Sequence, residues 1–217
     1  MNVLVMFDRE TNTLWSQLLG EGVEGPLKGT RLEFVPAVHM KWAVWKEQHP
    51  DTKALVKGYP GSYTSYSRYY ANNKAGVLGE TVFDNRLRTK QLVIGVVING
   101  EAVAYPFFEI GREKTLINDE IGGEPVLVVL DMDGSSGIVF SRRSQDGEVL
   151  TFSIMEGLRL TDEETGSTWD GRTGSAIDGP LGGTQLVRIK STKSYWFGWK
   201  DFFPGTRVYG EDTEDSE

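Results

Sequence analysis

The stretch QLVIGVVINGEAVAYP, residues 91–106, carries the clearest structural signal in the chain. Its first half, residues 91–98, is apolar on both faces of an extended strand, which is typical of a strand in the middle of a sheet. Asn99 and Gly100 form the dipeptide preferred in two-residue hairpin turns. The sequence therefore predicts a β-hairpin in which residues 91–98 pair with residues 101–105.

Further short apolar runs follow the same pattern of a strand bounded by turn residues. Glycine is abundant, with 26 residues, and glycine-containing turns recur along the chain. Short strands separated by such turns indicate a mainly β fold, either barrel-like or sandwich-like. The runs outside the hairpin are residues 125–130, 137–141 and 149–154.

Helix signals are sparse. Residues 13–19 and 41–49 are the two best candidates for short helices. In the second candidate, Trp42 and Trp45 lie at helical spacing and Pro50 ends the segment. We therefore expect few short helices.

An internal repeat is the strongest long-range signal. A shift of 154 residues places residues 8–52 on residues 162–206 without a gap, with 16 identities in 45 positions. Ordinary residue frequencies would give about 3 identities by chance. The period is too long for a solenoid, so we interpret the repeat as two related β-rich halves from an internal duplication. The identities include the pairs Asp8/Asp162, Trp15/Trp169, Trp42/Trp196, Trp45/Trp199 and Lys46/Lys200.

The repeat divides the chain into four parts. Residues 1–58 are predicted to form a first unit that is incomplete, because only one predicted strand, residues 2–7, precedes the first copy, whereas the predicted strands of residues 91–160 precede the second. Residues 59–90 are a tyrosine-rich connection, residues 91–209 the complete second unit, and residues 210–217 an acidic, disordered tail. Either the chain is a fragment or a naturally shortened form, which needs its missing N-terminal strands or a partner chain, or the incomplete unit packs onto the complete one. We favour the first alternative, because an unpaired edge strand at residues 2–7 would be a pairing hazard.

Residues shared by both copies are interpreted as scaffold, and those found in one copy as candidates for function. His39 and His49, the only histidines, lack counterparts: Lys193 and Phe203 occupy the equivalent positions. Either histidine is a weak candidate for a general base or metal ligand beside a carboxylate such as Glu21 or Asp51. No metal site is predicted, and no cofactor can be named.

The tyrosine-rich segment offers a candidate ligand surface. Tyr63, Tyr66 and Tyr70 are weak candidates for stacking on a sugar or peptide. The alternative interpretation is an ordered connection whose rings pack against both halves.

Composition excludes several classes of protein. The net charge of -8 argues against a nucleic-acid binder, and the absence of cysteine excludes disulfides and thiolate chemistry. The sequence contains no long apolar run typical of a transmembrane segment and no signal peptide. Phosphate-binding loops, dinucleotide fingerprints and hydrolase signatures are also absent from it.

Four stretches resemble one family. They are MFDRETNTLWSQLLGEGVEGPLKGTRLEFVPAVHMKWAVWKEQHPDT (6–52), VIGVVINGEAVAYP (93–106), INDEIGGEPVLVV (117–129) and LTFSIMEGLRLTDEETGSTWDGRTGSAIDGPLGGTQL (150–186). Together they are similar to domain-of-unknown-function family 3179 of bacteria and archaea, over nearly the whole chain.

The resemblance implies a longer protein, often exported or lipid-anchored, with two related β-rich halves. It also implies an upstream His-Glu stretch and a Tyr-Cys-Pro-x-Cys motif, and this chain begins downstream of both. The corresponding stretches of the second copy, residues 112–120 and 126–136, contain neither His nor Cys. The family supplies no activity to transfer.

Three functions remain as hypotheses. The first is a non-catalytic β-rich scaffold or binding module of a cell-envelope or exported protein. The second is a metal-binding or redox enzyme of unknown reaction, whose main site lies in the missing N-terminal part. The third is a fragment without independent activity. Whether the protein is an enzyme, its compartment, its oligomeric state and its partners are left open by the sequence.

Overall fold

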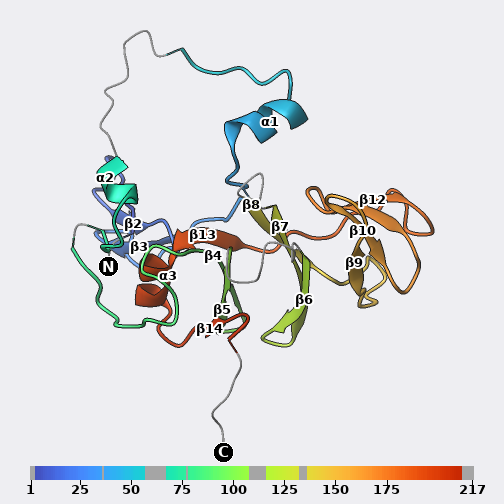
Figure 1. Cartoon of the computed structure of the whole chain (residues 1–217). Helices are drawn as coiled ribbons and strands as arrows, with labels where there is room; N and C mark the ends of the chain where they lie inside the picture. Colours follow the sequence, from blue (N-terminus) through green and yellow to red (C-terminus); the bar gives the residue numbers. More distant parts are fainter. Residues whose placement is uncertain are drawn as a thin grey trace, which may run out of the picture.

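The computed structural model describes residues 3–35, 37–56, 67–76, 78–107, 116–131 and 136–211. In this part of the chain, fourteen strands form four sheets and three short helices accompany them (Figure 1). The prediction of a mainly β fold with few short helices is therefore confirmed.

The central sheet is built on the predicted hairpin. Its β4 (Leu92–Ile98) and β5 (Glu101–Pro106) pair antiparallel, with Ile98 opposite Glu101. Asn99 and Gly100 have φ values of 49° and 87°, both in the left-handed region that a tight hairpin turn requires. The outer strands are β13 (Ser191–Tyr195), antiparallel to β4, and β14 (Arg207–Val208), parallel to β5.

A second sheet contains β6 (Leu116–Ile121), β7 (Glu124–Asp131) and β8 (Ser136–Ser141). The chain before β13 joins it to the central sheet, because Ser141 N–H donates to the Val187 carbonyl and Ile189 N–H to the Val139 carbonyl, both at 2.8 Å. The two sheets enclose a core that includes Ile94, Val103, Ile121, Val128 and Val139. The strand orders of the described sheets are open, so this barrel-like wrap is not a closed barrel.

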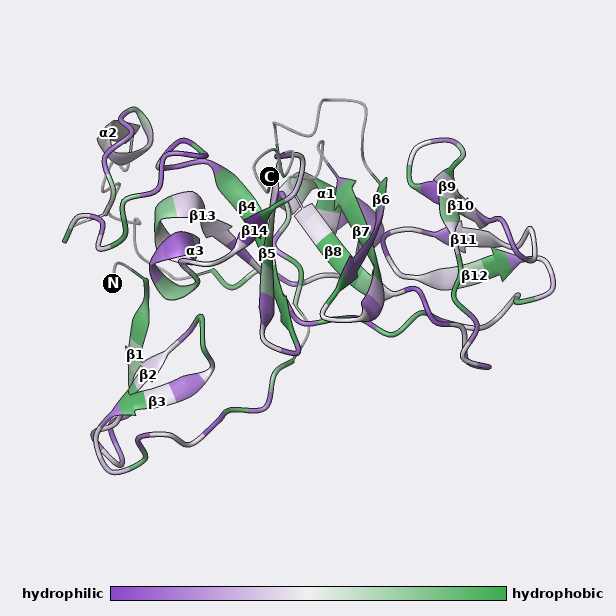
Figure 2. Cartoon of the chain, turned by 90° about the horizontal axis from the view of Figure 1, so that it is seen from below, coloured by the Kyte–Doolittle hydropathy of each residue, from purple (hydrophilic) through white to green (hydrophobic). Residues whose placement is uncertain are grey.

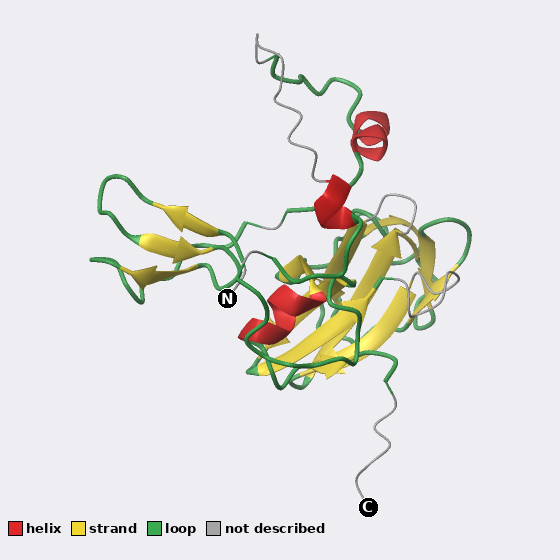
Figure 3. Ribbon diagram, turned by 60° about the vertical axis from the view of Figure 1, so that its left-hand side comes forward, coloured by secondary structure: helices red, strands yellow, loops and turns green. Residues whose placement is uncertain are grey.

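Two smaller sheets lie at opposite ends of this wrap (Figure 1). One contains β9 (Phe152–Ile154), β10 (Arg159–Asp162), β11 (Thr168–Asp170) and β12 (Ser175–Asp178). The other contains β1 (Val5–Phe7), β2 (Leu14–Ser16) and β3 (Glu21–Glu24), and Figure 3 shows it projecting beside the N-terminus.

The helix predicted over residues 13–19 is wrong, because β2 occupies its centre. The residues of β2 pair antiparallel with β1 on one side and with β3 on the other, which requires an extended backbone. The helix predicted over residues 41–49 is confirmed as α1 (Trp42–Gln48). The other helices are α2 (Ser67–Tyr70) and α3 (Trp196–Phe202).

The two sequence copies have the same local structure at the same offset of 154 residues. β2, β3 and α1 correspond residue for residue to β11, β12 and α3. Trp45 Nε1 donates to Thr52 Oγ1 at 2.9 Å, and Trp199 Nε1 donates to Thr206 Oγ1 at 2.9 Å. Local sequence therefore specifies the same turns, strands and helix in both places.

The copies differ in how much they bury. Trp196 and Trp199 of α3 are 0% and 2% exposed, whereas Trp42 of α1 is 55% exposed and no residue of α1 is buried. The scaffold interpretation of the shared tryptophans therefore fits the second copy better than the first. The difference arises because α3 packs against β4, while the described chain offers α1 no equivalent strand.

The connecting segment is anchored on α3. Lys200, which is 1% exposed, contacts Glu80 Oε2 at 2.5 Å and the Asp84 carbonyl at 2.8 Å. Trp196 Nε1 also donates to that carbonyl. Residues 57–66, 77 and 212–217 lie outside the described residues, and they include Tyr59, Tyr63 and Tyr66 of the tyrosine-rich connection and most of the predicted acidic tail.

Asp162 organises the turn between β10 and β11. Its carboxylate accepts hydrogen bonds from Trp169 Nε1 at 2.8 Å and from Thr165 N–H at 2.6 Å. Burial raises the pKa of Asp162, but the hydrogen bonds from Trp169 and Thr165 outweigh it, so the pKa lies below its ordinary value. Asp8 accepts a hydrogen bond from Thr11 Oγ1, equivalent to the one that Asp162 accepts from Thr165 Oγ1, but Asp8 is more exposed than Asp162.

Gly95 offers the first stability test. A Cβ added there would lie 2.2 Å from the buried Trp199 ring, so Gly95→Ala must displace α3. We expect a loss of roughly 2–3 kcal/mol in the free energy of unfolding, measured by urea denaturation. Gly205→Ala, where an added Cβ meets nothing within 4 Å and φ is not positive, is the control. Equal stability of the two variants would contradict the packing described.

Asp162→Asn offers the second test. At pH 7 the variant should lose about 1.5–3 kcal/mol, because hydrogen bonds to a buried carboxylate are strong. A lowered folded-state pKa stabilises the protein above the ordinary value of 3.8 and ceases to do so as the pH falls through the folded pKa. The gap between wild type and variant should therefore be constant from pH 7 to about 5 and shrink below 3.8. Asp8→Asn should have a smaller effect; a gap that grows on acidification would refute the assignment.

Candidate functional site

A groove runs along β13, between the β1–β3 sheet and the central sheet. It consists of three adjoining cavities of about 290, 610 and 500 Å³. Leu18 and Thr192 line both the first and the second cavity, whereas Val3, His39 and Lys193 line both the second and the third. We call this continuous surface the β13 groove.

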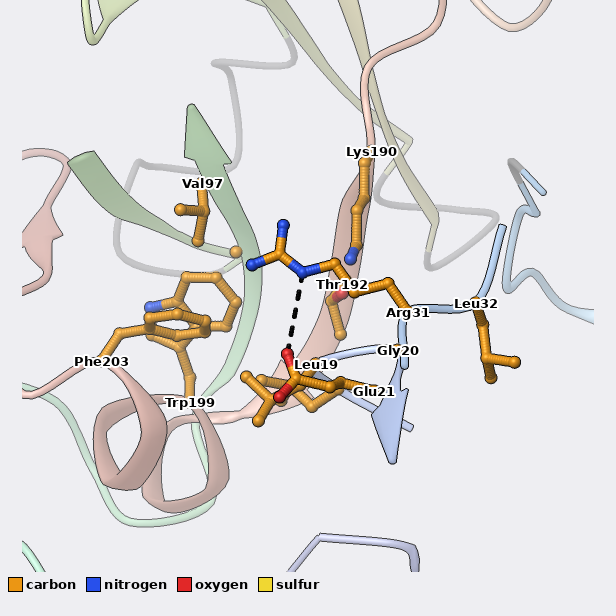
Figure 4. A pocket seen from close by; sticks show the side chains of 12 residues that line it. Leu19, Gly20, Glu21, Arg31, Leu32, Val97, Lys190, Thr192, Trp199 and Phe203 are labelled. Carbon is orange, nitrogen blue, oxygen red and sulfur yellow. Dashed lines mark ion pairs between the residues drawn. The ribbon is translucent and has the colours of Figure 1, made fainter. Parts of the chain in front are cut away.

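The first cavity has an aromatic floor and a charged rim (Figure 4). The rings of Trp199 and Phe203 form the floor, with centroids 4.4 Å apart. Glu21 and Arg31 meet across the rim with 3.8 Å between Oε2 and Nε, an exposed and therefore weak ion pair. Lys190 adds a second cation, so this cavity carries two cations and one carboxylate.

Lys190 also connects the first cavity to the second. Its Nζ lies 4.9 Å from the centroid of the Phe34 ring, a cation–π contact. Phe34 belongs to the lining of the second cavity. A ligand lying along β13 would thus meet a cation, a ring and a further cation, Lys193, in succession.

The third cavity gathers the aromatic residues of three segments. Tyr195 and Phe197 are stacked, with centroids 5.9 Å apart and planes 18° apart, and Tyr69 meets Tyr195 edge-on at 6.4 Å. Burial, followed by the neighbouring Tyr70, raises the pKa of both Tyr69 and Tyr195. These phenols therefore stay neutral at physiological pH and present hydroxyl groups.

Lys193 is the half-buried cation of the groove. Burial, followed by the Lys41 ammonium, lowers its pKa. Its Nζ also lies 5.2 Å from the centroid of the Phe107 ring. The charge of an anionic ligand would oppose both effects, because opposite charge favours the protonated amine.

The structure brings together two of the residues proposed from the sequence. His39 and Tyr70 both line the third cavity, and Tyr70 is 66% exposed. Tyr63 and Tyr66 lie outside the described residues. The carboxylate Glu21 lies in the first cavity with Arg31, and neither cavity lined by His39 has a carboxylate in its described lining.

His49 lies apart from the groove. It ends α1, and its ring packs on Trp45 with centroids 4.1 Å apart. Together with Asp170 and Arg172, it lines a separate cavity of about 720 Å³. Within the described residues, no three His, Asp or Glu side chains are grouped to hold a metal ion.

Sequence reasoning missed the groove residues Lys190, Lys193, Tyr195 and Phe203. One signal was available: Lys193 occupies the repeat position equivalent to His39, and these two residues line the same two cavities. The remaining groove residues had no sequence signal of function, because segments far apart in the chain bring them together.

The fold and the groove define a mainly β protein with an aromatic, cationic groove between a projecting sheet and a central one. The chain belongs to the family described as protein of unknown function (DUF3179), whose model matches residues 1–206 of 217. No curated protein and no solved structure matches the chain. None of the helices among the described residues has the length and apolar character needed to cross a membrane.

Proposed function

We propose that the chain is a non-catalytic binding module of a cell-envelope or exported protein, and that the β13 groove holds its ligand. The observation that carries this proposal is the alternation of rings and cations along the β13 groove. Trp199 and Phe203 are followed by Lys190, Phe34 and Lys193, and then by Tyr195. The cell-envelope setting rests on the family resemblance.

Ring faces and cations in this order fit an acidic sugar polymer. The apolar faces of sugar rings stack on aromatic side chains, while carboxylate or phosphate substituents pair with Lys and Arg. The net charge of the whole chain is -8, yet the three charged residues of the first cavity sum to +1. This local reversal of sign favours an anionic ligand over a neutral one.

The geometry also favours binding over catalysis. His39 shares its cavities with Lys193 and has no carboxylate in the described lining that would orient it as a base. Glu21 is already opposite Arg31. The groove thus lacks, among the described residues, the paired acid and base that hydrolysis of a sugar polymer uses.

We also infer that the two units arose by duplication. The supporting observations are the equivalent elements at one constant offset and the equivalent Trp–Thr and Asp–Thr hydrogen bonds. On this basis the groove lies where the first unit meets the second, and the ligand would contact both.

Binding to three probes tests the proposal: oligogalacturonate, cellohexaose and hexaglutamate, each titrated into the full chain by calorimetry. We expect oligogalacturonate to bind and cellohexaose to bind at least tenfold more weakly. Tyr195→Ala and Lys190→Gln should each weaken oligogalacturonate binding about tenfold, the scale of one stacking or charged contact.

Matched controls are Phe83→Ala, an aromatic residue that is 92% exposed and outside the groove lining, and Lys28→Gln, an exposed lysine outside it. Both should leave the affinity unchanged. The proposal fails if oligogalacturonate does not bind, if hexaglutamate binds equally well, or if the control variants lose as much affinity as the groove variants.

A further inference from the structure

β1 is the most exposed apolar strand in the described chain, and its outer edge is open. Val5, Met6 and Phe7 are 49%, 38% and 57% exposed, so both faces of the strand meet solvent. β1 is the end strand of its sheet, and no described strand pairs with its outer edge. Figure 2 shows this apolar strand at the border of the projecting sheet.

The same edge exists a second time in the chain, where it is covered. β10 is equivalent to β1 at the offset of 154 residues, and β9 pairs antiparallel with its outer edge. The register places Ile154, Ser153 and Phe152 opposite Leu160, Thr161 and Asp162, respectively. Leu160 and Asp162 are each only 1% exposed. The covered copy therefore shows what kind of element completes this edge.

Side-chain contacts of β9 define what a segment on β1 must offer. The Phe152 ring meets Trp169 edge-on at 5.7 Å, and Trp15 is the equivalent of Trp169. Glu164 Oε2 accepts a hydrogen bond from Thr151 N–H at 2.7 Å, and Glu10 retains that carboxylate. A segment on β1 thus needs a large apolar residue at the position of Phe152.

One difference between the two copies changes the charge that the segment on β1 must carry. In the second unit, Ser153 Oγ donates to Glu163 Oε1 at 3.3 Å. Arg9 occupies the position of Glu163 in the first unit. A carboxylate at the position of Ser153 would therefore pair with Arg9, whereas a cation there would be repelled.

We propose that the β1 edge binds an extended segment of another polypeptide, antiparallel and in the register of β9. That segment has a large apolar residue opposite Asp8 and an acidic residue next to it, within reach of Arg9. Main-chain hydrogen bonds supply affinity, and these two side chains supply specificity, as in other cases of strand addition to a sheet edge. This interaction is independent of the β13 groove.

A second copy of the chain fits the edge less well. In an antiparallel β1–β1 pair centred on Met6, Arg9 would face Val3 of the other copy and Asp8 would face Leu4. No carboxylate would then lie opposite Arg9. Charge therefore favours a different polypeptide over self-association.

The probe is a fluorescein-labelled peptide with the sequence of residues 149–156 of this chain and the substitution Ser153→Glu, titrated with the full chain by fluorescence anisotropy. We expect saturable binding. A peptide with Ser153→Lys should bind at least tenfold more weakly. The charge-reversed protein Arg9→Glu should invert this preference, which assigns the peptide to β1 because Arg9 has no positively charged equivalent beside β10.

Phe7→Pro blocks the edge while sparing the sheet. Asp8 N–H and the Leu4 carbonyl face β2, so the alternation along the strand directs Phe7 N–H outward. The variant should keep its melting temperature within a few degrees and lose peptide binding, because proline is tolerated on edge strands. Phe83→Ala, outside the edge, is the control and should bind normally.

Three results would overturn the proposal. The first is no binding of the Ser153→Glu peptide to a chain that sediments as a monomer. The second is no binding to a chain that sediments as a dimer and becomes monomeric in Phe7→Pro, which would assign the edge to a second copy. The third is binding with the same charge preference in wild type and Arg9→Glu.

Discussion

The indole of Trp199 lies directly on the backbone of β4 at Gly95, and the arrangement of the second unit depends on that close approach. Any side chain at residue 95 would occupy the space of the ring. Because the ring fits, α3 is held on the central sheet, where Lys200 can pair with Glu80 and Trp196 can be fully buried. The same ring forms part of the floor of the first cavity. Trp199 therefore contributes both to the packing of α3 on β4 and to the lining of the β13 groove.

In the first unit, the equivalent helix α1 lacks such a close contact with a strand of the described chain. α1 has the same length as α3, the same extended residue before it and the same Trp–Thr hydrogen bond, yet it buries none of its residues. Helix and cap follow from local sequence, whereas burial needs a strand with a glycine to receive the tryptophan. The same contrast separates Asp8 from Asp162, and β1 from β10. In each pair the type of local structure is the same, while the element that covers it differs.

This contrast explains which parts of the fold could be predicted from the sequence. The hairpin at Asn99-Gly100, the strands over residues 125–130 and 137–141 and the α1 helix were predicted correctly, because turn residues, apolar runs and helical spacing are local signals. The helix predicted over residues 13–19 was wrong because β2 occupies its centre and pairs with β1 on one side and with β3 on the other. The equivalent segment, residues 167–173, contains Gly171, a poor helix former that argues against a helix in either copy.

The candidate site was predictable only in part, for a physical reason. Lys190, Phe34 and Tyr69 come from segments that no local pattern relates, and they meet only because the chain before β13 crosses from one sheet to the other. His39 and Tyr70 were proposed as chemistry-bearing residues, and both lie in this groove. His39 lies there beside Lys193, its own repeat equivalent. Sequence comparison between the two copies aligned these residues without indicating that they share a cavity, because an alignment carries no information on how one unit is oriented against the other.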